Sequence, residues 1–156
     1  MSWRGDRIHL SAKPLGPTRR VAQQRTQLKP TGIWYACGYD WIRWLQGEQP
    51  DWLAGVRHAY LLDVDLRELA VLDTLQKLDD FDALYGLGGR DREQIDWAAV
   101  AKLYGGVEIC PYQRQRRMSL FWYYGWDVAS GVIWSPPALV GAREVDLDDL
   151  IRKASR

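Results

Sequence analysis

Residues 59–85 read Ala-Tyr-Leu-Leu-Asp-Val-Asp-Leu-Arg-Glu-Leu-Ala-Val-Leu-Asp-Thr-Leu-Gln-Lys-Leu-Asp-Asp-Phe-Asp-Ala-Leu-Tyr, and this stretch decides the class of fold. Its two short apolar runs, 59–64 and 69–73, are typical of buried strands. Thr74 can cap a helix over 75–85, which has apolar residues at helical spacing. Short strands with interspersed helices favour an α+β fold over a doubly wound sheet.

The same patterns continue on both sides of this stretch. Further strands are predicted over 8–11, 32–37, 107–111, 120–124 and 132–134. Further helical segments are predicted over 19–27, 40–45, 97–104 and 145–156, with a connection at 50–55 and a loop at 86–91. We expect one domain over residues 1–156, with a compact antiparallel or mixed sheet core and two or three short helices.

Composition excludes several classes of protein. The net charge is +1, so no overall electrostatic attraction to nucleic acid or to an anionic membrane is expected. No apolar run approaches the ~20 residues that span a bilayer, and the first residues lack the apolar core of a signal peptide. With only Cys37 and Cys110, a disulfide framework is not expected. The sequence therefore predicts a cytoplasmic protein with reduced thiols and no metal site.

The aromatic residues are unusual, because nine Trp and eight Tyr stand beside only two Phe. Indole and phenol rings bury large areas and keep a polar atom. They can form a core in place of Phe and Leu. They can also line a site that stacks a nucleobase or a nicotinamide ring. Both interpretations stay open at this point.

Three short segments carry a possible active-site pattern. His9-Leu10-Ser11 lies on the first predicted strand, and Gly32-Ile33-Trp34-Tyr35-Ala36 lies on the second. Much later, Gly105-Gly106-Val107-Glu108-Ile109 places one acid in an apolar strand. This order resembles the His–Tyr–Glu arrangement of ADP-ribosyltransferases of the diphtheria-toxin and poly(ADP-ribose) polymerase type. Leu10 departs from the small glycine of that family's first motif.

The resemblance implies an ADP-ribosyltransferase-like fold that uses NAD⁺ as a substrate, without a metal, for mono-ADP-ribosylation of a protein or nucleic acid. Glu108 would stabilise the positive charge that develops on the ribose during loss of nicotinamide. Tyr35 would stack on the nicotinamide. His9, with Ser11 in the same motif, would bind the adenosine ribose, and an arginine such as Arg19 or Arg25 would contact the pyrophosphate.

Other assignments remain open for these and neighbouring residues. Glu108 could instead point to solvent from a solvent-exposed face of its strand. Asp127 is a second candidate for the catalytic acid, although it could simply bond to backbone in a turn. A basic loop with aromatic neighbours, containing Arg114, Arg116 and Arg117, indicates an alternative function: a non-catalytic module that binds nucleic acid or protein.

Overall fold

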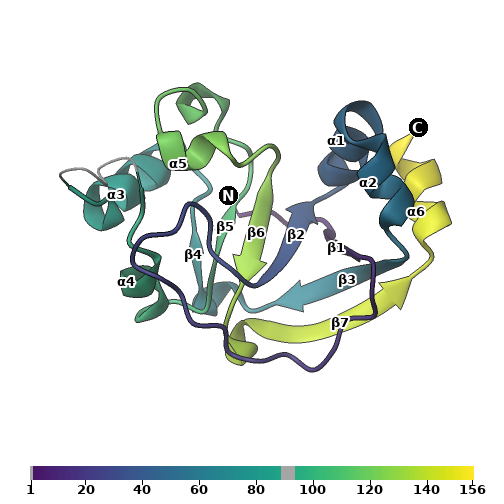
Figure 1. Ribbon diagram of the computed structural model, residues 1–156, viewed down its shortest axis with the longest axis horizontal. Helices are drawn as coiled ribbons and strands as arrows, with labels where there is room; N and C mark the ends of the chain where they lie inside the picture. Colours follow the sequence, from purple (N-terminus) through teal and green to yellow (C-terminus); the bar gives the residue numbers. More distant parts are fainter. Residues whose placement is uncertain (1, 89–93) are drawn as a thin grey trace.

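A computed structural model describes residues 2–88 and 94–156, and its centre is one curled, seven-stranded sheet (Figure 1). The strands are β1 (Arg7–Ser11), β2 (Ile33–Cys37), β3 (His58–Val64), β4 (Leu69–Val71), β5 (Gly106–Ile109), β6 (Ser130–Ile133) and β7 (Leu139–Val145). They lie in the order β4-β5-β6-β2-β1-β3-β7. Only β4 and β5 are parallel, so the predicted α+β class with a mixed sheet is confirmed.

The helices gather at the two ends of the sheet, as Figure 1 shows. The α-helices are α1 (Asp40–Glu48), α2 (Pro50–Gly55), α3 (Leu75–Tyr85), α4 (Trp97–Ala101), α5 (Phe121–Tyr124) and α6 (Leu147–Ala154). Single 3₁₀ turns are η1 (Leu66–Glu68), η3 (Arg114–Arg116) and η4 (Pro136–Ala138). One apolar cluster lies under α3, α4 and α5, and a second lies among α1, α2 and α6.

Side-chain caps explain why three of these helices begin where they do. Thr74 accepts a hydrogen bond from the Lys77 amide at 3.1 Å and starts α3 at the predicted position. Asp96 caps α4 in the same way, and Asp146 caps α6. Gly38 has φ +76°, a left-handed conformation that suits glycine and turns the chain from β2 into α1.

Several sequence predictions were wrong. The described residues contain six α-helices instead of two or three, and two of them fall on segments that were not predicted as helical. Residues 50–55, predicted as a connection, form α2. Residues 121–124 form α5, since the neighbouring rings Trp122 and Tyr123 both enter the core from one helical turn. Residues 19–27 contain no helix, and β7 was not predicted. Part of the predicted loop 86–91, from residue 89 onward, lies outside the described residues.

The register of β2, β6 and β5 places small residues of β6 between larger neighbours. Gly131 pairs with Tyr35 on one side and with Glu108 on the other. Alternation along a strand puts Ala129 and Gly131 toward the same face of the sheet. The larger side chains of the flanking strands can therefore meet over β6 on this face, which is opposite to the helices.

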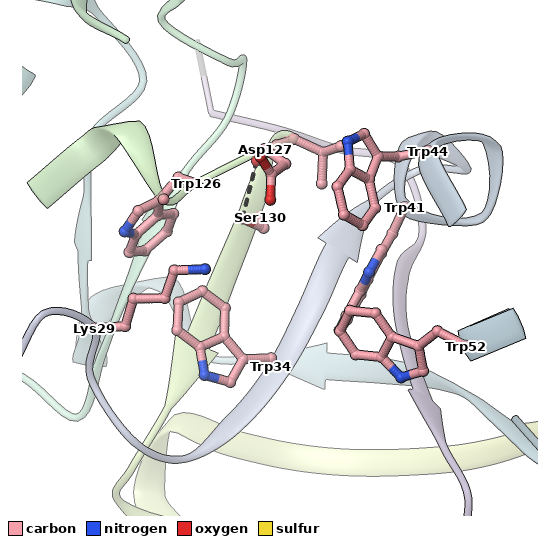
Figure 2. Close-up of a pocket in the computed structure, with 10 residues that line it drawn as sticks. Lys29, Trp34, Trp41, Trp44, Trp52, Trp126, Asp127 and Ser130 are labelled. Carbon is pink, nitrogen blue, oxygen red and sulfur yellow. Dashed lines mark hydrogen bonds between the residues drawn. The ribbon is translucent and has the colours of Figure 1, made fainter. Parts of the chain in front are cut away.

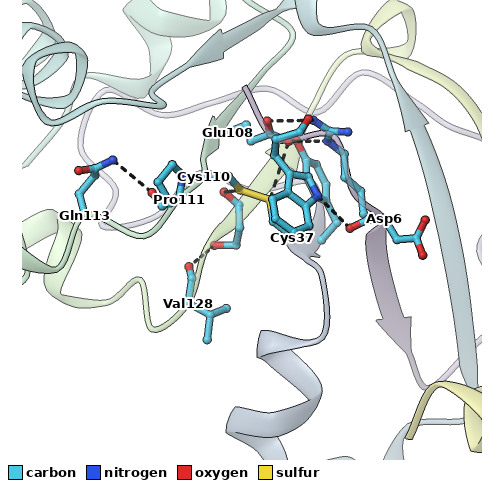
Figure 3. The surroundings of a disulfide bond; sticks show 11 residues. Asp6, Cys37, Glu108, Cys110, Pro111, Gln113 and Val128 are labelled. Atoms are coloured by element: carbon cyan, nitrogen blue, oxygen red, sulfur yellow. Dashed lines mark hydrogen bonds and ion pairs between the residues drawn. A yellow bond between two sulfur atoms is a disulfide. The ribbon is translucent and has the colours of Figure 1, made fainter. Parts of the chain in front are cut away.

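The two cysteines meet over Ala129 and form a disulfide (Figure 3). Cys37 ends β2, and its amide donates to the Ala129 carbonyl at 2.9 Å. Cys110 directly follows β5. The expectation of two reduced thiols is thus contradicted, because strand pairing brings together cysteines that are 73 residues apart in sequence.

Candidate functional site

A pocket lined mainly by tryptophan lies between the two groups of helices (Figure 2). Its volume is about 280 Å³. Five indole rings come from four separate elements, together with a lysine, an aspartate and a serine: Trp34, Trp41, Trp44, Trp52, Trp126, Lys29, Asp127 and Ser130. Because β2, α1, α2 and the α5–β6 loop all contribute, the folded chain is needed to build the pocket.

The rings surround the pocket at defined angles. Trp34 and Trp126 meet edge to face with centroids 4.9 Å apart, on the side of the sheet and α5. Trp41 and Trp52 meet edge to face at 6.1 Å, on the side of α1 and α2. Trp126 is buried, whereas Trp52 is 54% exposed. The pocket thus has a fixed wall and a solvent-facing wall, a shape suited to a flat ligand ring.

Two charged groups sit among these rings. The Lys29 ammonium lies 5.6 Å from the centroid of the Trp34 ring. Burial lowers the pKa of Lys29, and the nearby carboxylate of Asp127 partly opposes this effect. Asp127 is also 3.3 Å from the guanidinium of Arg117, and both side chains are 34% exposed. Asp127 is the only carboxylate among the residues lining this pocket.

Two further hollows adjoin the tryptophan pocket, and each shares two lining residues with it. A polar hollow of about 480 Å³ shares Trp44 and Asp127 with it and also contains Arg114 and Arg117. An apolar hollow of about 280 Å³ shares Trp41 and Trp52 and is also lined by residues of β1 and α2. No ion pair joins Arg114 to an acid within residues 2–88 and 94–156.

Glu108 lies on the opposite face of the sheet and is fully buried. Arg7 contacts both carboxylate oxygens, at 2.5 and 3.1 Å, and the Tyr35 hydroxyl donates to one of them at 3.0 Å. Burial tends to lower the pKa of Arg7, but Glu108 raises it above its usual value. Burial also raises the pKa of Tyr35 well above its usual value, and the charge of Glu108 adds to this. The structure therefore brings Glu108 and Tyr35 together, but they form a buried polar cluster with Arg7 and do not line the tryptophan pocket.

The other predicted residues are dispersed. His9 lies where β1 and β2 diverge, and its Nδ1 is 2.5 Å from the Trp34 carbonyl. Ser11 lines the apolar hollow and donates to the Lys13 carbonyl at 2.7 Å. Arg25 lies 3.8 Å from Asp96, which caps α4, and is absent from the pocket and the two hollows. Of the predicted residues, only Asp127 lines the tryptophan pocket.

Among the described residues, one group has donors arranged closely enough for a metal ion: Cys37, Glu108 and Cys110, within 4.8 Å of one another. The two sulfur atoms are bonded to each other. The carboxylate of Glu108 is held by Arg7 and Tyr35. All three donors are therefore already bonded to other groups of the protein.

Sequence reasoning missed the individual tryptophans. The excess of tryptophan was the available signal, together with the spacing of Trp41 and Trp44 on one helix face. That spacing is equally typical of a helix packed on a core, and it does not show that Trp126, 85 residues after Trp41, faces the same space.

Comparisons with known proteins give no assignment. No family model matches the chain, and no curated protein or solved structure is significantly similar to it. No helix of the described residues is both long and apolar enough to cross a membrane.

Proposed function

We propose that the protein binds NAD⁺ in the tryptophan pocket and transfers ADP-ribose to a macromolecule. One observation carries this proposal: Trp44 and Asp127 form a wall shared by a ring-lined pocket and a hollow that contains two arginines. A dinucleotide offers the same two features side by side, a flat ring and a pyrophosphate.

The nicotinamide ring of NAD⁺ is planar and carries a positive charge. Indole faces are electron-rich and attract such a ring more strongly than a neutral one. Trp34 and Trp126 provide such surfaces beside the carboxylate of Asp127. Lys29 is the one opposing charge in the lining, and its ammonium lies 5.6 Å from the centroid of the Trp34 ring.

In this proposal Asp127, rather than Glu108, is the catalytic acid. The bond between the nicotinamide nitrogen and the ribose breaks, the electron pair leaves with nicotinamide, and positive charge develops on the ribose. A carboxylate beside that carbon stabilises the charge. A nucleophile of the target then bonds to the ribose carbon and gives its proton to water. Asp127 is partly exposed, whereas the oxygens of Glu108 are enclosed by Arg7 and Tyr35.

Calorimetry with NAD⁺ and NADH tests the binding step. We expect NAD⁺ to bind more tightly, because reduction removes the charge of the ring but keeps its size and phosphates. Trp34→Ala should weaken binding of NAD⁺, since a stacked aromatic pair contributes about 0.5–1.5 kcal/mol beyond area burial. Incubation of the protein with labelled NAD⁺ and cell extract then identifies the modified fraction. Absence of NAD⁺ binding at millimolar concentration would rule out the proposal.

A second candidate function has its own observation. Met118, Phe121 and Tyr124 are 82%, 54% and 50% exposed, and the guanidinium of Arg117 lies 5.2 Å from the Tyr124 ring. Exposed rings beside arginines are typical of surfaces that bind single-stranded nucleic acid. Binding of a labelled oligonucleotide that weakens with salt, together with no NAD⁺ binding, would favour this non-catalytic function.

A further inference from the structure

The Cys37–Cys110 disulfide lies where three segments that build the candidate site begin or end (Figure 3). After Cys37 the chain turns at Gly38 into α1, which carries Trp41 and Trp44. After Cys110 it continues to the segment 112–117, which carries Arg114 and Arg117. Between the two cysteines lies the start of β6, which directly follows the loop containing Asp127.

Apart from strand pairing, the contacts that hold these segments together are noncovalent; the Tyr123 hydroxyl accepts from the Gln113 amide at 2.9 Å, and the Tyr112 and Tyr123 rings stack at 5.2 Å. The Cys37 amide bonds to the Ala129 carbonyl, and the Cys110 sulfur lies 4.0 Å from the Ser130 carbonyl. The ion pair between Arg117 and Asp127 is partly exposed, and pairs of that kind contribute about 0–1 kcal/mol. The disulfide is the one covalent link between the segments that follow its two cysteines.

We propose that this disulfide is a redox clamp that keeps the candidate site assembled, so that its reduction weakens ligand binding without unfolding the protein. This inference deepens the proposed function and rests on it for the identity of the ligand. The rest of the sheet does not depend on the bond, because β2 and β5 both pair with β6 through backbone hydrogen bonds.

One of the two cysteines borders a hollow. Both cysteines are buried, but Cys37 lines a hollow of about 440 Å³ together with Gly38, Pro111 and Tyr112. A thiolate of a dithiol reductant attacks the Cys37 sulfur, the S–S bond breaks, and the Cys110 sulfur leaves with the electron pair and takes up a proton. The second thiol of the reductant then displaces Cys37 as a thiol. The dithiol is oxidised to its own disulfide.

Hydrogen–deuterium exchange before and after treatment with dithiothreitol tests the clamp without any ligand. We expect faster exchange in residues 38–46, 111–117 and 125–129, and unchanged exchange in α4, which lies away from the disulfide. Calorimetry with NAD⁺ should show binding that is weaker by about tenfold in the reduced protein, within the usual range for coupled sites. Reoxidation should restore the original affinity.

The double variant Cys37→Ala/Cys110→Ala gives the same test without a reductant. It should resemble the reduced protein, and dithiothreitol should not change it further. Unchanged exchange in the three segments, or loss of protection throughout the chain including α4, would overturn the clamp. If the exchange changes as expected but neither form binds NAD⁺, the proposed function fails while the clamp stands.

Discussion

Tyr35 and Glu108 lie on strands that do not pair with each other, yet the Tyr35 hydroxyl donates to the Glu108 carboxylate at 3.0 Å. The strand between them, β6, presents Gly131 at this position. A Cβ atom on Gly131 would meet the Tyr35 hydroxyl well inside contact distance. A glycine is therefore required for the two side chains to meet over β6.

Gly131→Ala should accordingly destabilise the protein by about 2–4 kcal/mol, because the added methyl group displaces Tyr35 and leaves a buried polar group without its partner. Urea unfolding measures the change. Gly141→Ala is the matched control, since it is also in a strand and a Cβ there meets nothing within 4 Å. Equal stability of the two variants would show that Tyr35 does not depend on the glycine.

Glu108→Gln should reduce the free energy of unfolding by about 3–5 kcal/mol, because it leaves the charge of Arg7 buried without its partner. The sequence alone leads to the opposite expectation, namely a variant that keeps its stability and loses turnover. Urea unfolding decides between them. Glu144→Gln, an exposed acid beside His58, serves as the control and should change stability by about 0.5 kcal/mol at most.

The burial of His9 indicates how the stability of the protein depends on pH. Burial lowers the pKa of His9 below its ordinary 6.5, although the bond to the Trp34 carbonyl opposes this. The folded protein therefore binds a proton less readily than the unfolded chain. Stability should fall as the pH drops below about 6.5, by up to about 1.4 kcal/mol per pH unit for one proton. The pH dependence of the unfolding free energy should be flatter for His9→Gln than for the parent over this range. If His9→Gln keeps the parent's slope, His9 is not the group responsible.

The elements that could be predicted are those with local signals. The helix α3 was predicted at its observed bounds because Thr74 caps it and its apolar residues repeat with helical spacing. By contrast, β7 has an alternating pattern interrupted by Gly141 and two charged residues, and it becomes a strand through pairing with β3. The ion-pair partner of Glu108 could not be predicted either. Arg7 precedes Glu108 by 101 residues, and the two side chains meet only because of the order of the strands in the sheet.

Asp127→Asn tests the catalytic half of the proposed function. The amide keeps the shape of the side chain but removes the charge that would stabilise the ribose cation. We expect transfer of ADP-ribose to slow by about 10²-fold or more, and the affinity for NAD⁺ to fall by a smaller factor, because the carboxylate attracts the charged ring less strongly than the ribose cation of the transition state. Single-turnover rates with labelled NAD⁺ measure the first effect, and calorimetry measures the second. Asp148→Asn, at an exposed position of α6, should leave both unchanged. A normal rate for Asp127→Asn would remove Asp127 as the catalytic acid.

Arg114→Gln tests whether the polar hollow holds the phosphates of the ligand. Arg114 has no ion-pair partner among the described residues, so its charge is available, whereas Arg117 is already 3.3 Å from Asp127. A charged hydrogen bond to phosphate contributes about 1.5–3 kcal/mol, so Arg114→Gln should weaken NAD⁺ binding roughly tenfold or more. Nicotinamide riboside has the ring and ribose but no phosphate, and its affinity should be the same for the variant and the parent. The control is Arg143→Gln, an exposed arginine on β7, which should not affect either ligand. If Arg114→Gln weakens the binding of both ligands equally, Arg114 does not contact the phosphates. It then affects the pocket as a whole.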